Sequence, residues 1–195
     1  DLSERYHTPV IVRPTTRINH ASTFFDVADA TDARPVPDEG FERDSKWVIF
    51  PRRAYQAHGE INERLAAIAH DFAAEPTLAA FNPVAESGTT SRLGIVAGGV
   101  SAAYAREALR MVEARAAERG FEVPAYRFWQ VGTPYPFPEE LAAQFVEGLE
   151  QVLVLEELDH VLEDALLVHA GRTHAAYEVK GKLTGDTRDR GENDV

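Results

Sequence analysis

One stretch near the middle of the chain restricts the folds that are open to it. Residues 93–97 form a short apolar run, as a buried strand does, and Gly98 and Gly99 interrupt this run. Residues 102–109 are good helix formers, and we expect the Ser101 hydroxyl to cap the helix that they begin. A strand, a double glycine and a helix together make the corner from which open α/β sheets are built.

The same alternation continues along the second half of the chain. Apolar runs predict three further strands, and stretches with helix-forming composition lie between them. Pro138 stands at the start of one of these helices, and we expect Asp159 to cap the next one. The predicted strands are 125–131, 151–156 and 175–180, and the predicted helices are 102–119, 138–149 and 160–170. This order predicts a three-layer α/β fold with a mostly parallel sheet flanked by helices, and it leaves the direction of the last strand open.

The first half of the chain is less regular. Acidic and proline-rich composition predicts linkers there, and apolar positions at helical spacing predict one long helix. In chain order we predict the end of a helix at 2–6, a strand at 9–13, a polar loop at 14–20, a linker at 21–46, a helix at 51–74 and a second linker at 75–90. The charged tail from Leu183 predicts a third linker, and we place the main domain boundary at 75–90.

Composition excludes several kinds of function. The chain has 195 residues and a formal net charge of -12, which argues against a nucleic-acid surface because phosphates require clustered Lys and Arg. It has no cysteine, so disulfides, thiolate metal ligands and thiol nucleophiles are excluded for these residues. No apolar run approaches the ~20 residues of a membrane span, and no signal peptide is visible, so we expect a cytoplasmic protein. Because the chain begins at Asp1 without Met, we also expect it to be a piece of a longer protein.

The double-glycine turn invites a comparison with nucleotide-binding loops. Gly94, Gly98 and Gly99 do not have the spacing of the dinucleotide fingerprint, and the phosphate-loop pattern with Lys before Ser or Thr is absent. Free N–H groups at the start of the following helix still offer an anion-binding turn at Gly98, Gly99 and Ser101. One interpretation of the chain is therefore a free-standing α/β domain that binds a small anion or nucleotide there. Close packing of helix on strand is the favoured interpretation of the glycines.

The sequence contains no recognisable catalytic constellation. None of its seven histidines forms the pair, one helical turn apart, that zinc hydrolases use. Glu157 and His160 make a single Glu-x-x-His, whereas a di-iron site needs two copies and more glutamates, so we predict no metal site. The acidic residues around this position are better explained as favourable charge at a helix N-terminus. A nucleophile elbow is also absent, and we assign no catalytic residue.

A polar loop after the first predicted strand differs from the rest. Thr15, Thr16, Arg17 and His20 follow that strand, and ligands of α/β proteins bind beyond the carboxyl ends of strands. Arginine can hold a carboxylate or phosphate through two parallel hydrogen bonds. These four residues are therefore the candidates for a place next to a ligand.

Several motifs, taken in order, resemble one family of enzymes. They are Leu-Ser-Glu-Arg at 2–5, Arg-Pro-Thr-Thr-Arg at 13–17 with His20, Gly-Ile-Val-Ala-Gly-Gly at 94–99, Tyr104 through Leu109, Val-Gly-Thr-Pro-Tyr-Pro-Phe-Pro-Glu at 131–139, Val-Leu-Val-Leu-Glu-Glu-Leu at 152–158 and Lys-Gly-Lys-Leu-Thr-Gly at 180–185. In order and spacing they resemble the alpha subunit of indolepyruvate ferredoxin oxidoreductase, within the 2-oxoacid:ferredoxin oxidoreductases. The resemblance covers nearly the whole chain.

The resemblance implies a domain organisation. It makes residues 1–22 the tail of a preceding thiamine-binding domain, residues 23–90 a linker with one helix, residues 91–185 an α/β domain similar to the C-terminal domain of transketolase, and residues 186–195 a linker. The second thiamine-binding domain and the cluster-binding cysteines of the family are missing from this stretch. The resemblance therefore implies a structural and interface module that is inactive by itself.

The resemblance also implies a reaction for the parent protein. This is the oxidative decarboxylation of aryl pyruvates such as indolepyruvate to acyl-CoA, with ferredoxin as electron acceptor. Thiamine diphosphate, magnesium and iron–sulfur clusters are the implied cofactors of the parent, and we expect none bound to these residues alone. The implied partners are a beta subunit and ferredoxin, with a homodimer as a further expectation. Thr15, Thr16, Arg17 and His20 become candidates for positions next to substrate or coenzyme A.

Overall fold

A computed structural model of the chain describes residues 2–27, 29, 38, 40, 43–48 and 50–190, apart from the side chain of Arg17. The chain divides into two compact units, residues 1–64 and 65–195, and the division falls within the long helix α3 (Pro51–Ala74). Parts of the predicted linkers at 21–46 and 186–195 lie outside the described residues.

The second unit contains a five-stranded sheet with the strand order β1-β3-β2-β4-β5. The strands are β1 (Val84–Glu86), β2 (Leu93–Gly98), β3 (Tyr126–Val131), β4 (Gln151–Leu155) and β5 (Glu178–Lys180). Strand β2 pairs in parallel with β3 and β4, with Ile95 opposite Phe128 on one side and Leu153 on the other. Strand β5 is parallel to β4, which settles the direction that the sequence left open, and β1 is antiparallel to β3.

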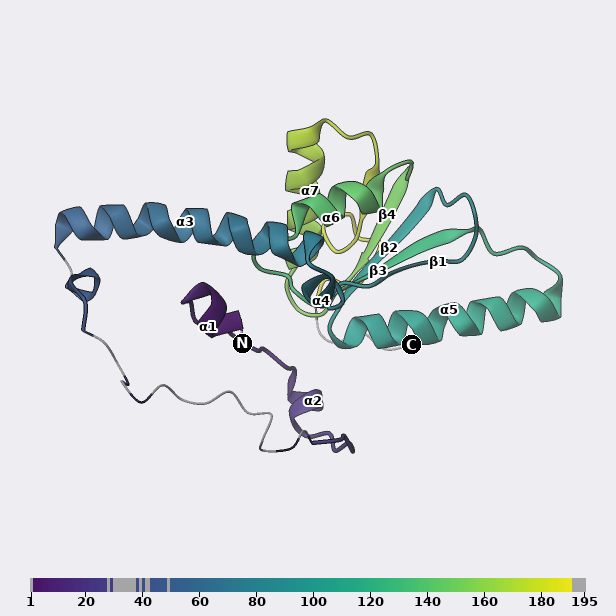
Figure 1. The fold of residues 1–195 in the computed structure, drawn as a ribbon. Coiled ribbons are helices and arrows are strands. Elements are labelled where there is room, and N and C mark those ends of the chain that lie inside the picture. The colour runs from purple at the N-terminus through teal and green to yellow at the C-terminus, as the bar shows by residue number, and fades with distance from the viewer. Residues whose placement is uncertain are drawn as a thin grey trace. The chain divides into compact units, whose positions relative to one another are not determined.

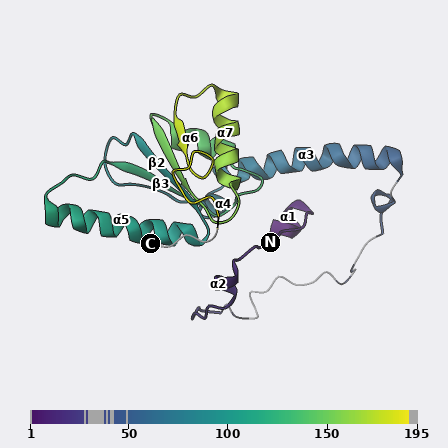
Figure 2. The same cartoon turned by 180° about the vertical axis from the view of Figure 1, so that it is seen from behind.

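Helices cover both faces of this sheet. Helix α5 (Val100–Arg119) follows β2, α6 (Glu139–Val146) follows β3, and α7 (Val161–Thr173) follows β4. Figure 1 shows α5 on one side of the sheet and α6 and α7 on the other, and Figure 2 shows the same three layers from behind. The predicted α/β class, with a mostly parallel sheet between helical layers, is confirmed.

The alternation of side chains along the strands produces two cores. Val96, Trp129 and Val154 point to the face that α6 and α7 cover, and they are completely or almost completely buried. Ile95 and Phe128 point to the opposite face and pack near α5. Trp129 also stacks at a tilt on Phe145 of α6, with ring centroids 5.3 Å apart. Burial on both faces explains why these strands have continuous apolar runs instead of alternating ones.

The segment predicted as a linker at 75–90 contains two elements that the composition did not indicate. These are the one-turn helix α4 (Pro76–Ala79) and the edge strand β1. Both are too short for periodicity to reveal, and β1 is exposed at all three positions. The strand is stabilised by its pairing with β3, where Ala85 lies opposite Phe128.

Two predicted helix caps are wrong. Gly99, and not Ser101, is the N-cap of α5, and no side chain caps this helix. Ser101 lies one residue inside the first turn and is buried. His160, and not Asp159, is the N-cap of α7. The N–H groups of α7 are instead satisfied from the preceding strand end by Glu156, a contact across six residues that local cap rules do not consider.

The described part of the first unit consists of short helical elements, irregular chain and the start of α3. Helix α1 (Leu2–Tyr6) and helix α3 are confirmed at the predicted positions. The strand predicted at 9–13 is wrong: the chain there has no regular secondary structure, and no strand of the described residues pairs with it. Part of the predicted loop at 14–20 is the one-turn helix α2 (Thr16–Asn19), and a 3-10 helix spans Ser45–Trp47.

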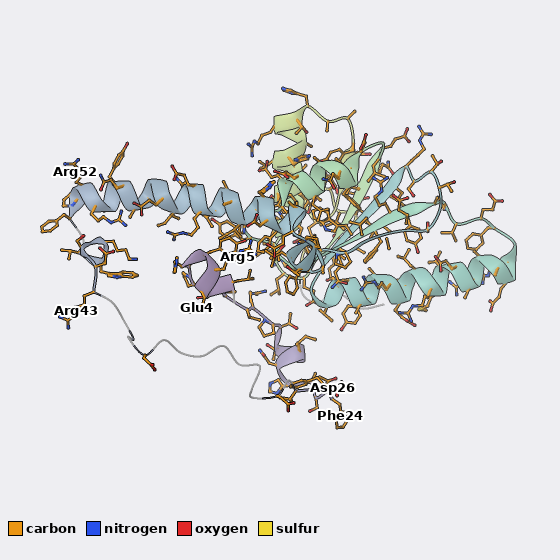
Figure 3. All side chains as sticks on the ribbon, in the orientation of Figure 1. Glu4, Arg5, Phe24, Asp26, Arg43 and Arg52 are labelled. Atoms are coloured by element: carbon orange, nitrogen blue, oxygen red, sulfur yellow. The ribbon has the colours of Figure 1, made fainter. Side chains whose placement is uncertain are left out.

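Large apolar side chains of the first unit are exposed to solvent. Ile11 and Val12 are 88% and 83% exposed, and Phe24, labelled in Figure 3, is fully exposed. By contrast Ile68 and Phe72, at the other end of α3, are buried in the second unit. Within the described residues, no helix is long and apolar enough to cross a membrane.

Candidate functional site

Four parallel strands end at the same edge of the sheet. The last residues of β2 and β4, Gly98 and Leu155, belong to neighbouring strands whose following helices cover opposite faces. The two loops therefore diverge, and this point is a topological switch point of the sheet. Ligands of open α/β sheets bind at such points, so this edge of the sheet is a candidate ligand site.

The double-glycine turn lies at this switch point. A Cβ atom at Gly98 would lie 3.0 Å from Cδ1 of Leu162, so this glycine permits α7 to pack closely on β2. Gly99 has a φ of +55°, which non-glycine residues adopt at a cost, and open space surrounds the place of a Cβ there. The close packing of a helix on a strand, which was the favoured interpretation of the glycines, is therefore present at Gly98. The turn also presents the first N–H groups of α5 without a side-chain cap, so anion binding at Gly98, Gly99 and Ser101 stays a prediction.

A groove of about 280 Å³ begins beside this turn. Its apolar part comes from Leu155 and from one face of α5, and its polar part comes from a segment that follows β5. The lining residues are Ser101, Tyr104, Ala105, Ala108, Leu155, Thr187 and Arg188. The groove is therefore mixed in chemistry, with an arginine at one side.

The loop after β4 contains a buried carboxylate. Glu156 accepts hydrogen bonds from the backbone N–H groups of Leu162 at 2.8 Å and Glu163 at 3.0 Å. Burial raises the pKa of the Glu156 carboxyl above its ordinary value, although these hydrogen bonds act in the opposite direction. Through these contacts, Glu156 fixes the first turn of α7 against the end of β4. The prediction that acids here stabilise a helix N-terminus agrees with this geometry.

Glu157 and His160, the first and last residues of the Glu-x-x-His motif, make no hydrogen bond with each other. The Nδ1 atom of His160 lies 2.8 Å from the carboxylate of Asp164, and this contact raises the pKa of His160. One carboxylate oxygen of Glu157 is buried and has no hydrogen-bond partner. No three metal-binding side chains of His, Asp or Glu gather anywhere in the part of the chain that the structure describes.

Sequence reasoning missed a clamp at the end of β3. Asn82 is 2% exposed, and its side-chain oxygen accepts hydrogen bonds from the N–H groups of Gly132 at 3.0 Å and Thr133 at 3.2 Å. Its amide nitrogen donates to the Thr133 hydroxyl at 2.7 Å. The partners lie about fifty residues apart, so no local pattern indicates them. The clamp fixes the carboxyl end of β3 against the segment after α4.

The four candidates next to a ligand lie in the first unit. Thr15 precedes α2, its side chain caps no N–H group, and its hydroxyl is buried without a hydrogen-bond partner. Thr16 and His20, at the two ends of α2, are exposed, and the side chain of Arg17 lies outside the described residues. A single helical turn thus brings Thr15, Thr16, Arg17 and His20 together in one short stretch.

Comparison with known proteins gives relatives over nearly the whole chain. No family model matches it. The indolepyruvate oxidoreductase subunit IorA of Methanothermobacter marburgensis is 34% identical over 187 residues, which are 95% of this chain and 28% of the relative. The curated IorA relatives that the chain matches are 28–34% identical to it, and it spans 26–28% of their length.

Solved structures show weaker similarity. A split-gene transketolase, described as an inactive beta4 tetramer, has a TM-score of 0.40 and 22% identity, with 51% of this chain and 31% of that chain covered. A 2-oxoglutarate:ferredoxin oxidoreductase from Magnetococcus marinus has a TM-score of 0.43 and 17% identity, with 68% and 20% covered.

The sequence matches are the firmer of the two comparisons, since each of them covers 93–95% of the chain. They confirm the resemblance that the ordered motifs predicted. The chain is related, over 93–95% of its length, to one stretch of the indolepyruvate oxidoreductase subunits called IorA.

Proposed function

We propose that this chain is the middle part of the alpha subunit of a thiamine-diphosphate-dependent oxidoreductase that oxidatively decarboxylates aryl pyruvates such as indolepyruvate. Coenzyme A accepts the acyl group and ferredoxin takes the electrons. The similarity to IorA subunits over 93–95% of the chain is the observation that carries this proposal. In this protein a beta subunit and ferredoxin are the partners.

The cofactors of such an enzyme do not fit the residues present in this stretch. The chain has no cysteine to ligate an iron–sulfur cluster. Its described residues also contain no group of three acidic or histidine side chains that suits a magnesium ion. We therefore assign thiamine diphosphate, magnesium and the clusters to the remainder of the subunit or to its partner, and we derive no step of the reaction from this chain.

The role of this stretch is structural, and it forms interfaces with the rest of the enzyme. Residues 91–185 contribute four of the five strands of the sheet and both of its cores, and β1 (Val84–Glu86) adds the fifth strand. Asn82 and Glu156 fasten the strand ends. Residues 1–22 form the tail of a preceding domain, and residues 23–64 and the chain after residue 188 are connections. Residues 65–90, which the sequence assigned to a linker, belong to the same compact unit as the sheet. The exposed Ile11, Val12 and Phe24 support this assignment, because exposed apolar surface on a segment outside the core is typical of a surface that another part of a protein covers.

Within this role, the stretch from Thr15 to His20 lies next to substrate or coenzyme A. An uncapped one-turn helix, with a buried hydroxyl at Thr15 that has no partner, supports a position completed by another part of the enzyme. Arg17 is the residue of choice for a carboxylate or phosphate, since its guanidinium can donate two parallel hydrogen bonds.

A second candidate function is the binding of a small anion at Gly98, Gly99 and Ser101. The observation that favours it is the start of α5 at a glycine with no side-chain cap. Inorganic phosphate at millimolar concentration then raises the melting temperature of the protein, and Gly99→Ala weakens this effect. A melting temperature that phosphate leaves unchanged contradicts this second function and leaves the first one untouched.

The experiment for the main proposal is an assay of the complete enzyme that contains this chain. We expect reduction of ferredoxin that depends on indolepyruvate, coenzyme A and thiamine diphosphate together. Residues 1–195 alone, at the same concentration, give no reduction. Activity of the isolated chain, or an enzyme indifferent to thiamine diphosphate, contradicts the proposal.

A further inference from the structure

Glu163, in the first turn of α7, has a carboxylate that is almost completely removed from solvent. The residue is 1% exposed. A buried carboxylate is costly unless hydrogen bonds replace its lost water. Here the replacement comes from backbone N–H groups: Lys182 donates to Oε2 at 2.8 Å, and Leu183 donates to Oε1 at 3.1 Å. Glu163 therefore holds the chain just after β5.

The residue before these donors, Gly181, leaves no room for a side chain while Glu163 stays in place. A Cβ atom at Gly181 would lie 2.6 Å from the carboxyl carbon and from Oε2 of Glu163. No carboxylate can remain in place at that separation, so any side chain at Gly181 displaces Glu163. The close approach of Gly181 to a buried acid shows that the chain after β5 packs directly against the Glu163 carboxylate.

The segment continues as a closed loop. The Gly181 carbonyl accepts hydrogen bonds from the N–H groups of Asp186 at 2.9 Å and Thr187 at 3.0 Å. Further along, the ammonium group of Lys182 donates to the Arg188 carbonyl at 2.7 Å, and Lys182 is only 7% exposed. Both ends of the segment are thus tied by buried charged groups, one anionic and one cationic.

The far end of this segment lines the groove at the switch point. Thr187 and Arg188 face Leu155 and the Ser101–Ala108 face of α5 across the groove of about 280 Å³. The contacts of Glu163 and Lys182 therefore determine the position of one wall of that groove.

We propose that residues 181–188 form a strap that closes the groove, and that Glu163 and Lys182 are the positioning residues that fasten it. Release of either contact opens the groove at the switch point while the sheet stays folded. The shape of the groove therefore depends on the conformation of residues 181–188, which directly follow β5. This inference does not depend on the proposed enzyme activity, because it rests only on contacts within the second unit.

Two variants of the full-length protein test the strap. Glu163→Gln keeps the shape of the side chain but replaces one acceptor oxygen by an NH₂ group that faces the backbone donors. Lys182→Met keeps the apolar stem and removes the donor to Arg188. Glu118→Gln, an exposed position on α5, is the matched control for the loss of a carboxylate.

Hydrogen–deuterium exchange followed by mass spectrometry is the first measurement. In Glu163→Gln we expect the amides of peptides covering 181–188 to exchange at least about tenfold faster, while peptides covering β2 and β4 keep their rates. Lys182→Met accelerates exchange at 186–188, and Glu118→Gln changes neither region. Hydroxyl-radical labelling of Tyr104, in the groove, increases in both strap variants.

Three results overturn the proposal. The first is rapid exchange of residues 181–188 in the unaltered protein, which would make them an ordinary linker. The second is unchanged exchange in both strap variants. The third is equal acceleration of β2, β4 and the strap, which would mean that Glu163 stabilises the whole domain and that no separate strap exists.

Discussion

The imidazole of His70, on α3, lies with its Nδ1 atom 2.8 Å from the carboxylate of Glu140, on α6. This hydrogen bond raises the pKa of His70 above its ordinary value of 6.5. A raised pKa in the folded chain means that protonated His70 stabilises the fold fully below pH 6.5. This contribution is lost as the pH rises through the raised value.

His70→Ala therefore lowers the melting temperature at pH 5.5 and changes it little at pH 9. His58→Ala, an exposed histidine of the same helix, serves as the control and shows no such dependence on pH. Thermal unfolding at the two pH values is the measurement. A His70→Ala effect that is larger at pH 9 than at pH 5.5 would show that the ion pair does not contribute.

Asn82→Ala removes the acceptor for the N–H groups of Gly132 and Thr133 and leaves both without their partner. An unsatisfied buried donor costs about 1–3 kcal/mol, so we expect the free energy of unfolding to fall by at least about 2 kcal/mol in urea titrations. Asn62→Ala, on the exposed part of α3, changes it by less than about 0.5 kcal/mol. Equal effects of the two variants would refute the clamp.

Two glycines offer a matched pair for the turn at the switch point. Neither Gly99 nor Gly59 has any atom within 4 Å of the place of a Cβ, but only Gly99 has a positive φ. Gly99→Ala destabilises the protein by about 1 kcal/mol or more, because alanine is strained there. Gly59→Ala, in the middle of α3, stabilises it by about 0.5–1 kcal/mol. Urea titrations measure both, and a stabilising Gly99→Ala would mean that the turn relaxes to another conformation.

Much of the second unit was predictable because each strand and helix is long enough for its pattern to show. The run at 93–97 and the helix after it, for example, appear in the structure as β2 and α5 with nearly the predicted bounds. What local patterns missed depends on contacts between distant residues. The strand β1 forms only by pairing with β3, and Asn82 finds its hydrogen-bond partner in Thr133. The start of α7 is held by the carboxylate of Glu156.

The candidate site was predictable only in part. The strand–helix corner at Gly98 and Gly99 appears in the structure as predicted, but its position at a switch point depends on the strand order, which the sequence did not give. The contacts by which Glu163 holds the segment at the groove also have no signal in the sequence. A glutamate in a first helical turn is typical of favourable charge at a helix N-terminus, so Glu163 looked ordinary. The short strand at 9–13 failed for the opposite reason, since its residues have strand composition but no strand beside them among the described residues.

Arg17 tests the position that we propose for residues 15–20. In the complete enzyme, Arg17→Ala raises the KM for the 2-oxoacid or for coenzyme A by about 10–100-fold, because a charge-assisted hydrogen-bond pair is lost. Arg17→Lys restores only part of the affinity, since lysine lacks the planar pair of donors. Arg13→Ala, in the same stretch, is the control and leaves both KM values within about twofold. Unchanged KM values in Arg17→Ala would remove this residue from the neighbourhood of the ligands.

The most direct test of the whole account is the substrate preference of the complete enzyme. Reduction of ferredoxin is measured with indolepyruvate, pyruvate and 2-oxoglutarate in turn, with coenzyme A and thiamine diphosphate present. The account predicts a kcat/KM for indolepyruvate that exceeds both others by at least about tenfold, which corresponds to about 1.4 kcal/mol of transition-state stabilisation. A higher kcat/KM for either aliphatic acid, or no reduction with any of the three, would contradict it.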